Sequence, residues 1–440
     1  MNKKKLLDQI KASGVVGAGG AGFPTYKKLE ASVDTLIANA AECEPLLYSD
    51  KDLIKKKSSE LIEGMKLSIE LVGAKKGIIA IKEKYEDLIQ LLEKQLPGNI
   101  EIFLLPDAYP VGDEQVLVWE VLNRIVPEGG LPLEVGVVVQ NVGTLFNVFN
   151  ALKNNEPVIS RFVTVLGEVE KPFVADVAIG TSISYLIDYA GGVRKALQDR
   201  FKILEGGPMT GKLVEDINQP ITKTTSGIIV LPENHYIIHQ LEARESLIIK
   251  KAQSYCCMCQ SCTEVCPRYL IGHDMRPDVL MKSVSIFKRL DTTAYLCCEC
   301  GLCEIYACPM DLSPRLVARQ LKQKLLEAGI KNPHHSAPNR VHTIREFRQI
   351  PGNRLIMKAN LRKYKVVPDS IKTKLSSSII QILLQQHIGS PAKPVVKVND
   401  KVTQGQVIAK MENDFLGADV HSSINGNVIE VTDKFIKIKK

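Results

Sequence analysis

The chain has 440 residues, of which 45% are hydrophobic and 24% are charged, and its formal net charge is +8. This length exceeds one ordinary hydrophobic core and predicts roughly three domains. The basic residues are scattered rather than gathered into an aromatic-interleaved strip, which argues against nucleic-acid binding, and no run of about 18 apolar residues could span a bilayer.

The first residues, MNKKKLLDQIKASG, contain no apolar core of signal-peptide length. We therefore expect a cytoplasmic protein. Because that compartment keeps thiols reduced, the eleven cysteines are not expected to form disulfides.

Residues 1–155 are expected to form an α/β domain. Four short apolar runs, DTLIANA, KKGIIAIK, EIFLLP and GVVVQNVG, indicate buried strands, and SSELIEGMKLSIELVG between them has amphipathic helical spacing. This alternation is typical of a layered α/β structure.

A glycine-rich loop, GVVGAGGAGFPT at 14–25, opens this domain. Gly17, Gly19 and Gly22 fit G-x-G-x-x-G, and Glu42 and Glu44 follow where a dinucleotide-binding fingerprint has its acidic residue. The fingerprint also requires a buried strand before the glycines, whereas the preceding residues are charged and helix-like. The match alone is weak evidence for a dinucleotide site.

Residues 156–240 change in character. A hairpin through GEVEKP, a short helix and a further strand predict a small β-rich module of ubiquitin-like, β-grasp type.

Ten of the eleven cysteines lie between 256 and 308. Two runs of the form C-x2-C-x2-C-x3/4-C, each followed by proline, match the pattern of two-cluster bacterial ferredoxins. The predicted cluster ligands are Cys256, Cys259, Cys262 and Cys266 in the first run and Cys297, Cys300, Cys303 and Cys308 in the second. Helical spacing between and after the runs predicts a helical ferredoxin domain at 245–330 with two [4Fe-4S] clusters.

In ferredoxins of this type the fourth cysteine of each run binds the other cluster. This crossing places Cys308 with the first run and Cys266 with the second. The alternative, in which each run binds its own cluster, uses the same eight residues and remains open. Zinc is the competing interpretation, but zinc sites favour pairs of cysteines separated by a long spacer. Cys257 and Cys298 are expected to be packing residues, with a one-residue shift in ligation as the alternative.

Residues 331–380 are expected to be a linker in which His334 and His335 are solvated. Residues 381–440 contain short strands punctuated by Gly, Asn and Asp, in two similar halves, and predict a flattened barrel-sandwich hybrid. Lipoyl and biotinyl carriers share this pattern. Since no lysine lies at the turn between the halves, a swinging prosthetic arm is not expected.

The motifs GVVGAGGAGFPT, ANAAECEP, GGPMTG and CPRYLIGH, in this order and before a C-terminal barrel, resemble the RnfC-like family, which is related to the flavin-binding subunit of complex I. Within it the chain is most similar to the PduS-type cobalamin reductases of propanediol-utilisation microcompartments. The resemblance covers essentially the whole chain. It implies a complex I flavoprotein-like α/β domain, an SLBB-like β-grasp module, the ferredoxin domain and the barrel, in a multidomain α/β and α+β architecture.

The resemblance also implies a function for the glycine loop, which would bind FMN and let NADH stack on the flavin. Carried over by position, the residues facing flavin or nucleotide are Gly17, Gly19, Gly20, Phe23, Lys28, Asn39, Glu42, Glu44, Tyr109, Gly112, Asp113, Glu114, Asn141 and Thr144. Gly20, Phe23, Glu44 and Glu114 would lie on the NADH side. Asn141 and Thr144 would lie at the phosphate-binding end.

Three positions depart from the complex I relatives. Ala18 replaces an arginine, Ala41 an aspartate and Gln140 an asparagine. The lost cation and carboxylate weaken the expectation of NADH binding more than that of flavin binding.

The resemblance implies electron transfer from NADH through FMN and two [4Fe-4S] clusters to cob(III)alamin and cob(II)alamin, since a flavin converts hydride transfer into single-electron steps. It further implies a partner adenosyltransferase, and microcompartment shell proteins or enzymes as neighbours. Two other functions compete: an RnfC-like electron-transfer adaptor, and an NADH-linked redox partner of another reductase. No residue is assigned as a general acid, base or nucleophile, or as a corrinoid ligand.

Overall fold

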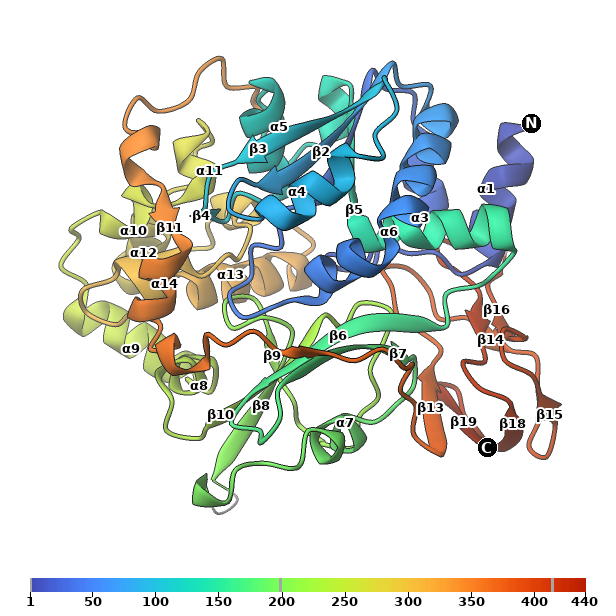
Figure 1. Cartoon of the computed structure of the whole chain (residues 1–440). Helices are drawn as coiled ribbons and strands as arrows, with labels where there is room; N and C mark the ends of the chain where they lie inside the picture. The colour runs from blue at the N-terminus through green and yellow to red at the C-terminus, as the bar shows by residue number, and fades with distance from the viewer. Residues whose placement is uncertain (1, 198–199, 413–414) are drawn as a thin grey trace.

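The computed structural model of the chain describes residues 2–197, 200–412 and 415–440. Its units follow the order expected from the sequence, and they pack side by side around a shared centre (Figure 1). None of the helices in these described ranges is long and apolar enough to cross a membrane.

The N-terminal domain is built on a four-stranded parallel sheet in the order β3-β2-β1-β5. The four predicted apolar runs form these strands. The near-continuous burial of β1, β2 and β5 agrees with a sheet covered on both faces, whereas the edge strand β3 is largely exposed or half-buried. The domain contains α1 (Lys3–Ala12), α2 (Thr25–Leu29), β1 (Thr35–Ala40), α3 (Ser49–Val72), β2 (Lys76–Lys82), α4 (Glu86–Glu93), β3 (Ile100–Leu105), β4 (Ala108–Tyr109), α5 (Glu114–Leu122), the short turn η1 (Pro132–Val135), β5 (Val137–Asn141), α6 (Val142–Phe149) and η2 (Asn150–Asn154).

Helices cover both faces of this sheet. Residues of α1, α3 and α6 share one core cluster with the strands, and Leu117 and Val118 of α5 belong to a second cluster on the sheet. The backbones of α3 and α6 approach closely at Gly64, where an added Cβ would lie 2.0 Å from the carbonyl oxygen of Leu145. Glycine is therefore required at this helix crossing.

The second unit has the β-grasp arrangement. Its sheet order is β12-β7-β6-β10-β8-β9, with β10 parallel to β6 and antiparallel to β8. Apolar residues of α7 pack with the sheet in one core cluster. The elements are β6 (Ser160–Gly167), β7 (Phe173–Ala178), α7 (Ile183–Tyr189), η3 (Lys195–Leu197), β8 (Phe201–Glu205), β9 (Lys212–Leu213), β10 (Gly227–Pro232) and α8 (Tyr236–Leu241).

The cysteine-rich unit is helical, as predicted. The expected helix after the second run ends at Glu327, and Gly329 follows with a φ of +68°. The helical pattern between the runs is interrupted, because Asp291 accepts a hydrogen bond from the Ser283 hydroxyl and caps a new turn at Thr293. The elements are α9 (Glu245–Tyr255), α10 (Ser261–Glu264), α11 (Pro267–Leu270), α12 (Pro277–Ser285), η4 (Thr292–Leu296), η5 (Leu302–Ala307) and α13 (Pro314–Glu327).

The segment 331–380, expected to be a linker, is packed on the other units. Strand β11 pairs with β4 of the N-terminal domain, and β12 pairs with β7. Leu355, Leu361 and Tyr364 are buried in a core shared with other units, so this segment uses their core and needs none of its own. Its elements are η6 (Arg345–Arg348), β11 (Ile350–Pro351), α14 (Gly352–Lys358), η7 (Arg362–Tyr364) and β12 (Asp369–Ser370).

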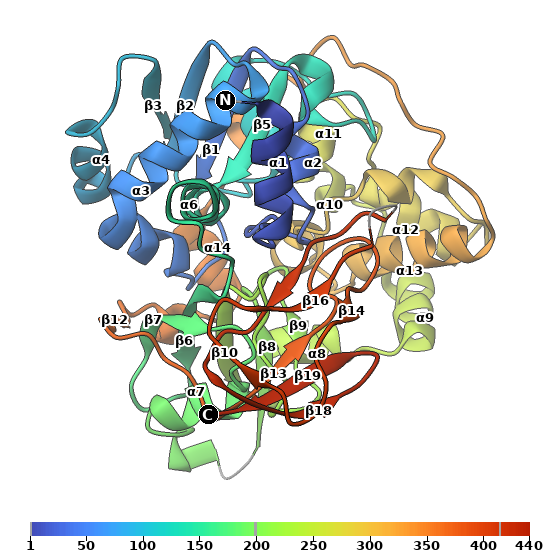
Figure 2. The same cartoon turned by 90° about the vertical axis from the view of Figure 1, so that its right-hand side faces the viewer.

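The C-terminal unit consists of two small sheets, β13-β19-β18-β15 and β14-β16-β17, around one apolar cluster. This agrees with the predicted barrel-sandwich. It lies beside α1 and the β-grasp module in both ribbon views (Figures 1 and 2). The elements are β13 (Ile379–Leu383), β14 (Lys393–Pro394), β15 (Lys401–Val402), β16 (Val407–Lys410), β17 (Val420–His421), β18 (Gly426–Val431) and β19 (Phe435–Lys439).

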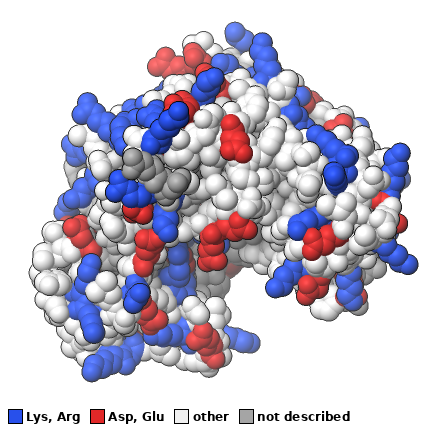
Figure 3. All heavy atoms as spheres, turned by 90° about the horizontal axis from the view of Figure 1, so that it is seen from below, with Lys and Arg blue, Asp and Glu red and all other residues white. Residues whose placement is uncertain are grey.

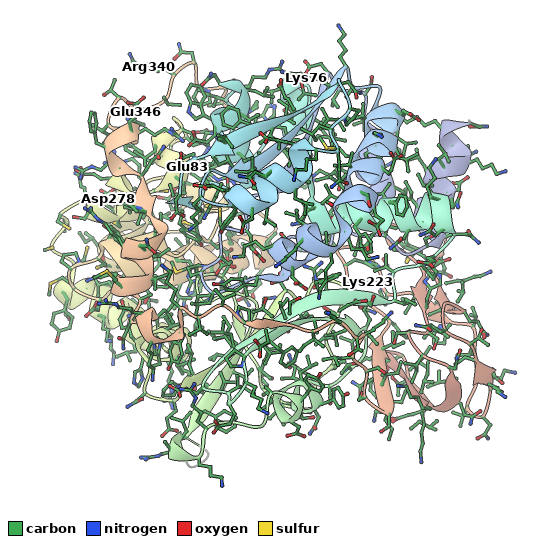
Figure 4. All side chains as sticks on the ribbon, viewed as in Figure 1. Lys76, Glu83, Lys223, Asp278, Arg340 and Glu346 are labelled. Atoms are coloured by element: carbon green, nitrogen blue, oxygen red, sulfur yellow. The ribbon has the colours of Figure 1, made fainter. Side chains whose placement is uncertain are left out.

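Lys223 joins three units at one point, labelled in Figure 4. Its Nζ donates to the carbonyl oxygens of Gly14, 2.7 Å away, and of Asp419, 3.0 Å away. The side chain is buried, and this burial lowers the pKa of Lys223 to about 7. The barrel is thereby held against the start of the glycine loop.

Charged side chains on the face seen from below alternate in sign. Figure 3 shows lysine and arginine intermingled with aspartate and glutamate on this face. This agrees with the scattered charge in the sequence.

Candidate functional site

A cavity of about 700 Å³ lies where the N-terminal domain, the β-grasp module, the second cysteine run and the barrel meet. Its walls come from six separate stretches of chain. They are the glycine loop at 18–21, the residues after β1 at 39–50, the loop at 109–113, the β-grasp loops at 205–212 and 222–226, and Gln385, Gln386 and His387 of the barrel, with Asn141, Arg161, Cys298 and Cys300 completing the wall.

The glycine loop is a closed turn between α1 and α2. Val16 and Pro24 form an antiparallel bridge, and the Gly17 N–H donates to the Phe23 carbonyl at 2.9 Å. No strand leads into the loop, and β1 comes after it. The loop therefore lacks the strand-loop-helix context of a Rossmann fold.

Nine of the fourteen residues expected to face flavin or nucleotide line this cavity. They are Gly19, Gly20, Asn39, Glu42, Glu44, Tyr109, Gly112, Asp113 and Asn141. The sequence resemblance thus groups residues from four separate segments around one space.

The other five lie outside the cavity wall. Lys28 and Glu114 form an ion pair with each other. Thr144 is fully buried and accepts a hydrogen bond from the Ala18 N–H at 2.9 Å. The Gly17 N–H is used inside the loop, and the Phe23 side chain is exposed.

Glu42 and Asp50 form a half-buried acidic pair at the start of α3. Glu42 accepts hydrogen bonds from the backbone N–H groups of Asp50, at 2.8 Å, and of Lys51, so it caps α3. Asp50 accepts from the Asn141 side chain at 2.7 Å. Burial, and then the charge of Glu42, raise the pKa of Asp50 to about 6. Asp50 carries no sequence signal beyond being a helix-start acid, and the sequence pattern did not select it.

Glu44 connects the N-terminal domain to the GGPMTG loop of the β-grasp module. Its carboxylate accepts from the Met209 N–H at 3.0 Å and from the Thr210 hydroxyl at 2.7 Å. Burial raises the pKa of Glu44, while these two donors lower it. Gly207 must be glycine here, because an added Cβ would lie 2.1 Å from Glu44 Oε2.

The cysteines of the two runs are interleaved in space. Cys256, Cys259 and Cys262 of the first run line one small cavity together with Cys308 of the second run. Cys266 lies with the second run instead: burial is the main reason that its thiol pKa is raised, and the charges of Cys298 and Cys297 raise it further. The place of Cys308 beside the first run is the one that the crossed assignment predicts.

No three His, Cys, Asp or Glu side chains in the described ranges converge on a single-ion site. A [4Fe-4S] cluster differs from such a site, because its four thiolates bind four separate irons at the corners of a cubane. Two groups of four thiols therefore fit two such clusters by their donor set.

The second cysteine group touches the large cavity. Cys298 and Cys300 lie in its wall, and the Tyr109 hydroxyl donates to the Cys300 carbonyl at 2.7 Å. Arg268, two residues after Cys266, forms an ion pair with Asp113 at 2.8 Å, and both side chains are mostly covered. Asp113 also caps α5 by accepting from the N–H groups of Gln115 and Val116. The cavity and the second cysteine group are thus tied by two polar contacts.

The first cysteine group lies near the surface. Met258 and Met310, which line its small cavity, are 46% and 44% exposed, and Cys257 and Cys259 are exposed as well. The two cysteine groups therefore extend from the cavity toward solvent.

Family models match the chain in the order of these units. A Nuo51 FMN-binding domain matches residues 10–150, an SLBB domain 162–213, a 4Fe-4S dicluster domain 255–313 and an RnfC barrel-sandwich hybrid domain 358–440. These matches confirm the predicted fold class.

Similar proteins are known along the full length. "Cobalamin reductase PduS" of Citrobacter freundii is 39% identical over 437 residues, covering 98% of this chain and 96% of that protein. The protein of the same name in Salmonella typhimurium is 37% identical, covering 100% and 97%. One subunit of a proton-translocating ferredoxin:NAD(+) oxidoreductase complex from Clostridium ljungdahlii is 33% identical, covering 61% and 57%. An NAD+-reducing [NiFe]-hydrogenase structure is similar at 22% identity and a TM-score of 0.49, covering 76% of this chain and 63% of its own.

Proposed function

The chain belongs to the PduS cobalamin reductase family, and from this premise we propose that it transfers electrons from NADH, through FMN and two [4Fe-4S] clusters, to cobalamin. The observation that carries the proposal is the shared wall between the large cavity and the second cysteine group. The cavity volume is within the range of ordinary cofactor sites.

The residues that line this cavity would hold a flavin, and that flavin would supply the conversion of two-electron hydride transfer into single-electron steps. Tyr109 and Cys300 join the cavity to the second cysteine group by their hydrogen bond. Cys303 of that group is close enough to Cys262 of the first group for their charges to interact. Clusters held by the two groups would form a relay from the cavity to the surface, where a corrinoid acceptor would approach Met258 and Met310.

We propose that the nine lining residues contact flavin or nicotinamide, and that the remaining five act from behind the wall. Gly17, Phe23 and Thr144 hold the shape of the glycine loop through their hydrogen bonds and the turn they form. Lys28 and Glu114 neutralise each other beside it. The eight predicted cysteines would ligate the clusters in the crossed arrangement, Cys256, Cys259, Cys262 and Cys308 holding one and Cys266, Cys297, Cys300 and Cys303 the other.

Family membership supports two finer proposals: a cytoplasmic location within a propanediol-utilisation microcompartment, and transfer of the reduced corrinoid to a partner adenosyltransferase. Fractionation of intact microcompartments tests the first, and co-purification with the adenosyltransferase of the same organism tests the second. Absence of the protein from purified compartments would contradict the first, and failure to co-purify would contradict the second.

The function is tested by purifying the protein anaerobically and measuring iron, sulfide and released flavin. NADH is then added, followed by cob(III)alamin, while the visible spectrum is recorded. We expect about eight irons, from two four-iron clusters, and one FMN per chain. We also expect bleaching by NADH and reoxidation by the corrinoid. Cofactors that stay oxidised with NADH would favour the adaptor function, and cofactors that NADH reduces but cobalamin does not reoxidise would favour another acceptor.

A further inference from the structure

Arg161 is a buried cation in the wall of the cavity that the sequence pattern did not select. It lies at the start of β6, in the β-grasp module, yet its side chain reaches the glycine loop of the N-terminal domain. Its Nε donates to the Thr225 carbonyl at 2.7 Å, and its Nη2 donates to the Ala18 carbonyl at 2.5 Å. The guanidinium is therefore fixed in one orientation.

This cation has no ion-pair partner within 4.0 Å in the described part of the chain, although the residue is only 9% exposed. The carboxylates of Asp50 and Glu42 act on it only as more distant charges. A buried guanidinium without a counter-ion in contact is costly, unless a bound group supplies the missing negative charge.

The third nitrogen, Nη1, points to where that group would bind. Nη1 makes no hydrogen bond among the described residues, and it lies 3.8 Å from the Cβ position of Gly143, in the first turn of α6. Asn141, the N-cap of α6, lines the same cavity. The Asn141 side-chain oxygen already accepts from the Gly143 N–H at 2.8 Å, so the Arg161 Nη1 is the free donor beside the positive end of α6, and both its charge and the helix dipole favour an anion.

We propose that Arg161 binds the phosphate of FMN, with its Nη1 donating to a phosphate oxygen. This inference rests on the proposed function and adds a residue from a different module to the flavin site. The phosphate of a resident flavin fits better than that of exchanging NADH, because the guanidinium lies deep in the wall. With the phosphate at Arg161, the flavin ring would lie against the other wall of the cavity, which is formed by Tyr109, Cys298 and Cys300.

The test compares FMN with riboflavin, which lacks only the phosphate. Flavin-free protein with its clusters intact is titrated with each flavin, and binding is followed by quenching of flavin fluorescence. The variants are Arg161→Gln and Arg161→Lys, and the matched control is Arg124→Gln, which removes a partly exposed arginine that pairs with Asp34. Iron content and melting temperature are recorded for each variant.

Loss of a charge-assisted hydrogen bond predicts that Arg161→Gln weakens FMN binding about tenfold or more, while riboflavin binding stays unchanged. Arg161→Lys keeps the charge, so it should retain part of the preference for FMN and stay folded even if the glutamine variant does not. Equal weakening of both flavins, or a loss confined to NADH binding, would overturn the proposal while leaving the proposed function intact. Wild-type protein that binds neither flavin would overturn both.

Discussion

The neighbouring glycines Gly19 and Gly20 give opposite predictions when each is changed to alanine. An added Cβ at Gly19 would lie 2.9–3.0 Å from three side-chain atoms of Asn141, whereas a Cβ at Gly20 would meet nothing within 4 Å. Both residues line the cavity. The Gly19 change therefore collides with protein, and the Gly20 change occupies space that we assign to a ligand.

The magnitudes follow from these distances. Crowding of Asn141, which caps α6, should lower the free energy of unfolding by about 1–3 kcal/mol in Gly19→Ala. Gly20→Ala should change it by less than about 0.5 kcal/mol. If the new methyl group meets the flavin with a similar overpacking penalty, FMN affinity should fall by about 5- to 150-fold.

The single tryptophan of the chain, Trp119 in α5, reports on unfolding of the N-terminal domain in urea. Flavin affinity is measured on the same preparations by fluorescence quenching. Gly20→Ala protein that binds FMN as tightly as wild type would refute the placement of the flavin against the glycine loop. Equal destabilisation by the two variants would refute the reasoning from Cβ contacts.

Three further predictions concern the clusters, the module junction and the link between domains. The double variant Cys259→Ser/Cys308→Ser should keep about four irons, because both residues would bind one cluster. Cys259→Ser/Cys266→Ser should lose both clusters, as iron analysis and electron paramagnetic resonance (EPR) can show. Equal iron loss in the two double variants would contradict the crossed arrangement. The pKa of Lys223 is about 7 in the folded protein and ordinarily 10.5. Between these pH values the unfolded chain binds a proton that the folded protein does not, so the free energy of unfolding should fall as pH is lowered from about 10.5 to 7. Lys223→Met should remove this pH dependence in urea titrations at several pH values. Arg268→Met removes the ion-pair partner of the mostly covered Asp113, which keeps its two backbone N–H donors, and should cost about 1–3 kcal/mol. Arg348→Met, at a half-exposed pair with Glu264, should cost less than about 1 kcal/mol by the same unfolding measurement, and equal costs would contradict this reasoning.

The strands and cluster motifs could be predicted from sequence because their signals are local. Continuous apolar runs identify β1, β2, β3 and β5, and regular cysteine spacing identifies the ferredoxin domain. The segment 331–380 could not be read in this way, because Leu355 and Tyr364 bury themselves against other units.

The candidate site was only partly predictable for a similar reason. The sequence shows Ala18 where the complex I relatives have an arginine. It does not show that Arg161, 143 residues later, donates a hydrogen bond to the Ala18 carbonyl. Likewise, Gln386 and His387 reach the cavity because the barrel docks on the other units through contacts that include Lys223 with Gly14 and Asp419, and Ser423 with Ile179. Long-range contacts of this kind depend on how modules dock, which residue spacing does not encode.

The central claim is that electrons leave the cavity through the second cysteine group and reach the first group afterwards. Rapid-freeze EPR of NADH-treated Cys266→Ser and Cys259→Ser proteins tests this order, with wild type as the reference. We predict that the cluster remaining in Cys259→Ser is still reduced by NADH at the wild-type rate, while the cluster remaining in Cys266→Ser stays oxidised. Reduction of the surface cluster at the wild-type rate in Cys266→Ser would contradict the claim.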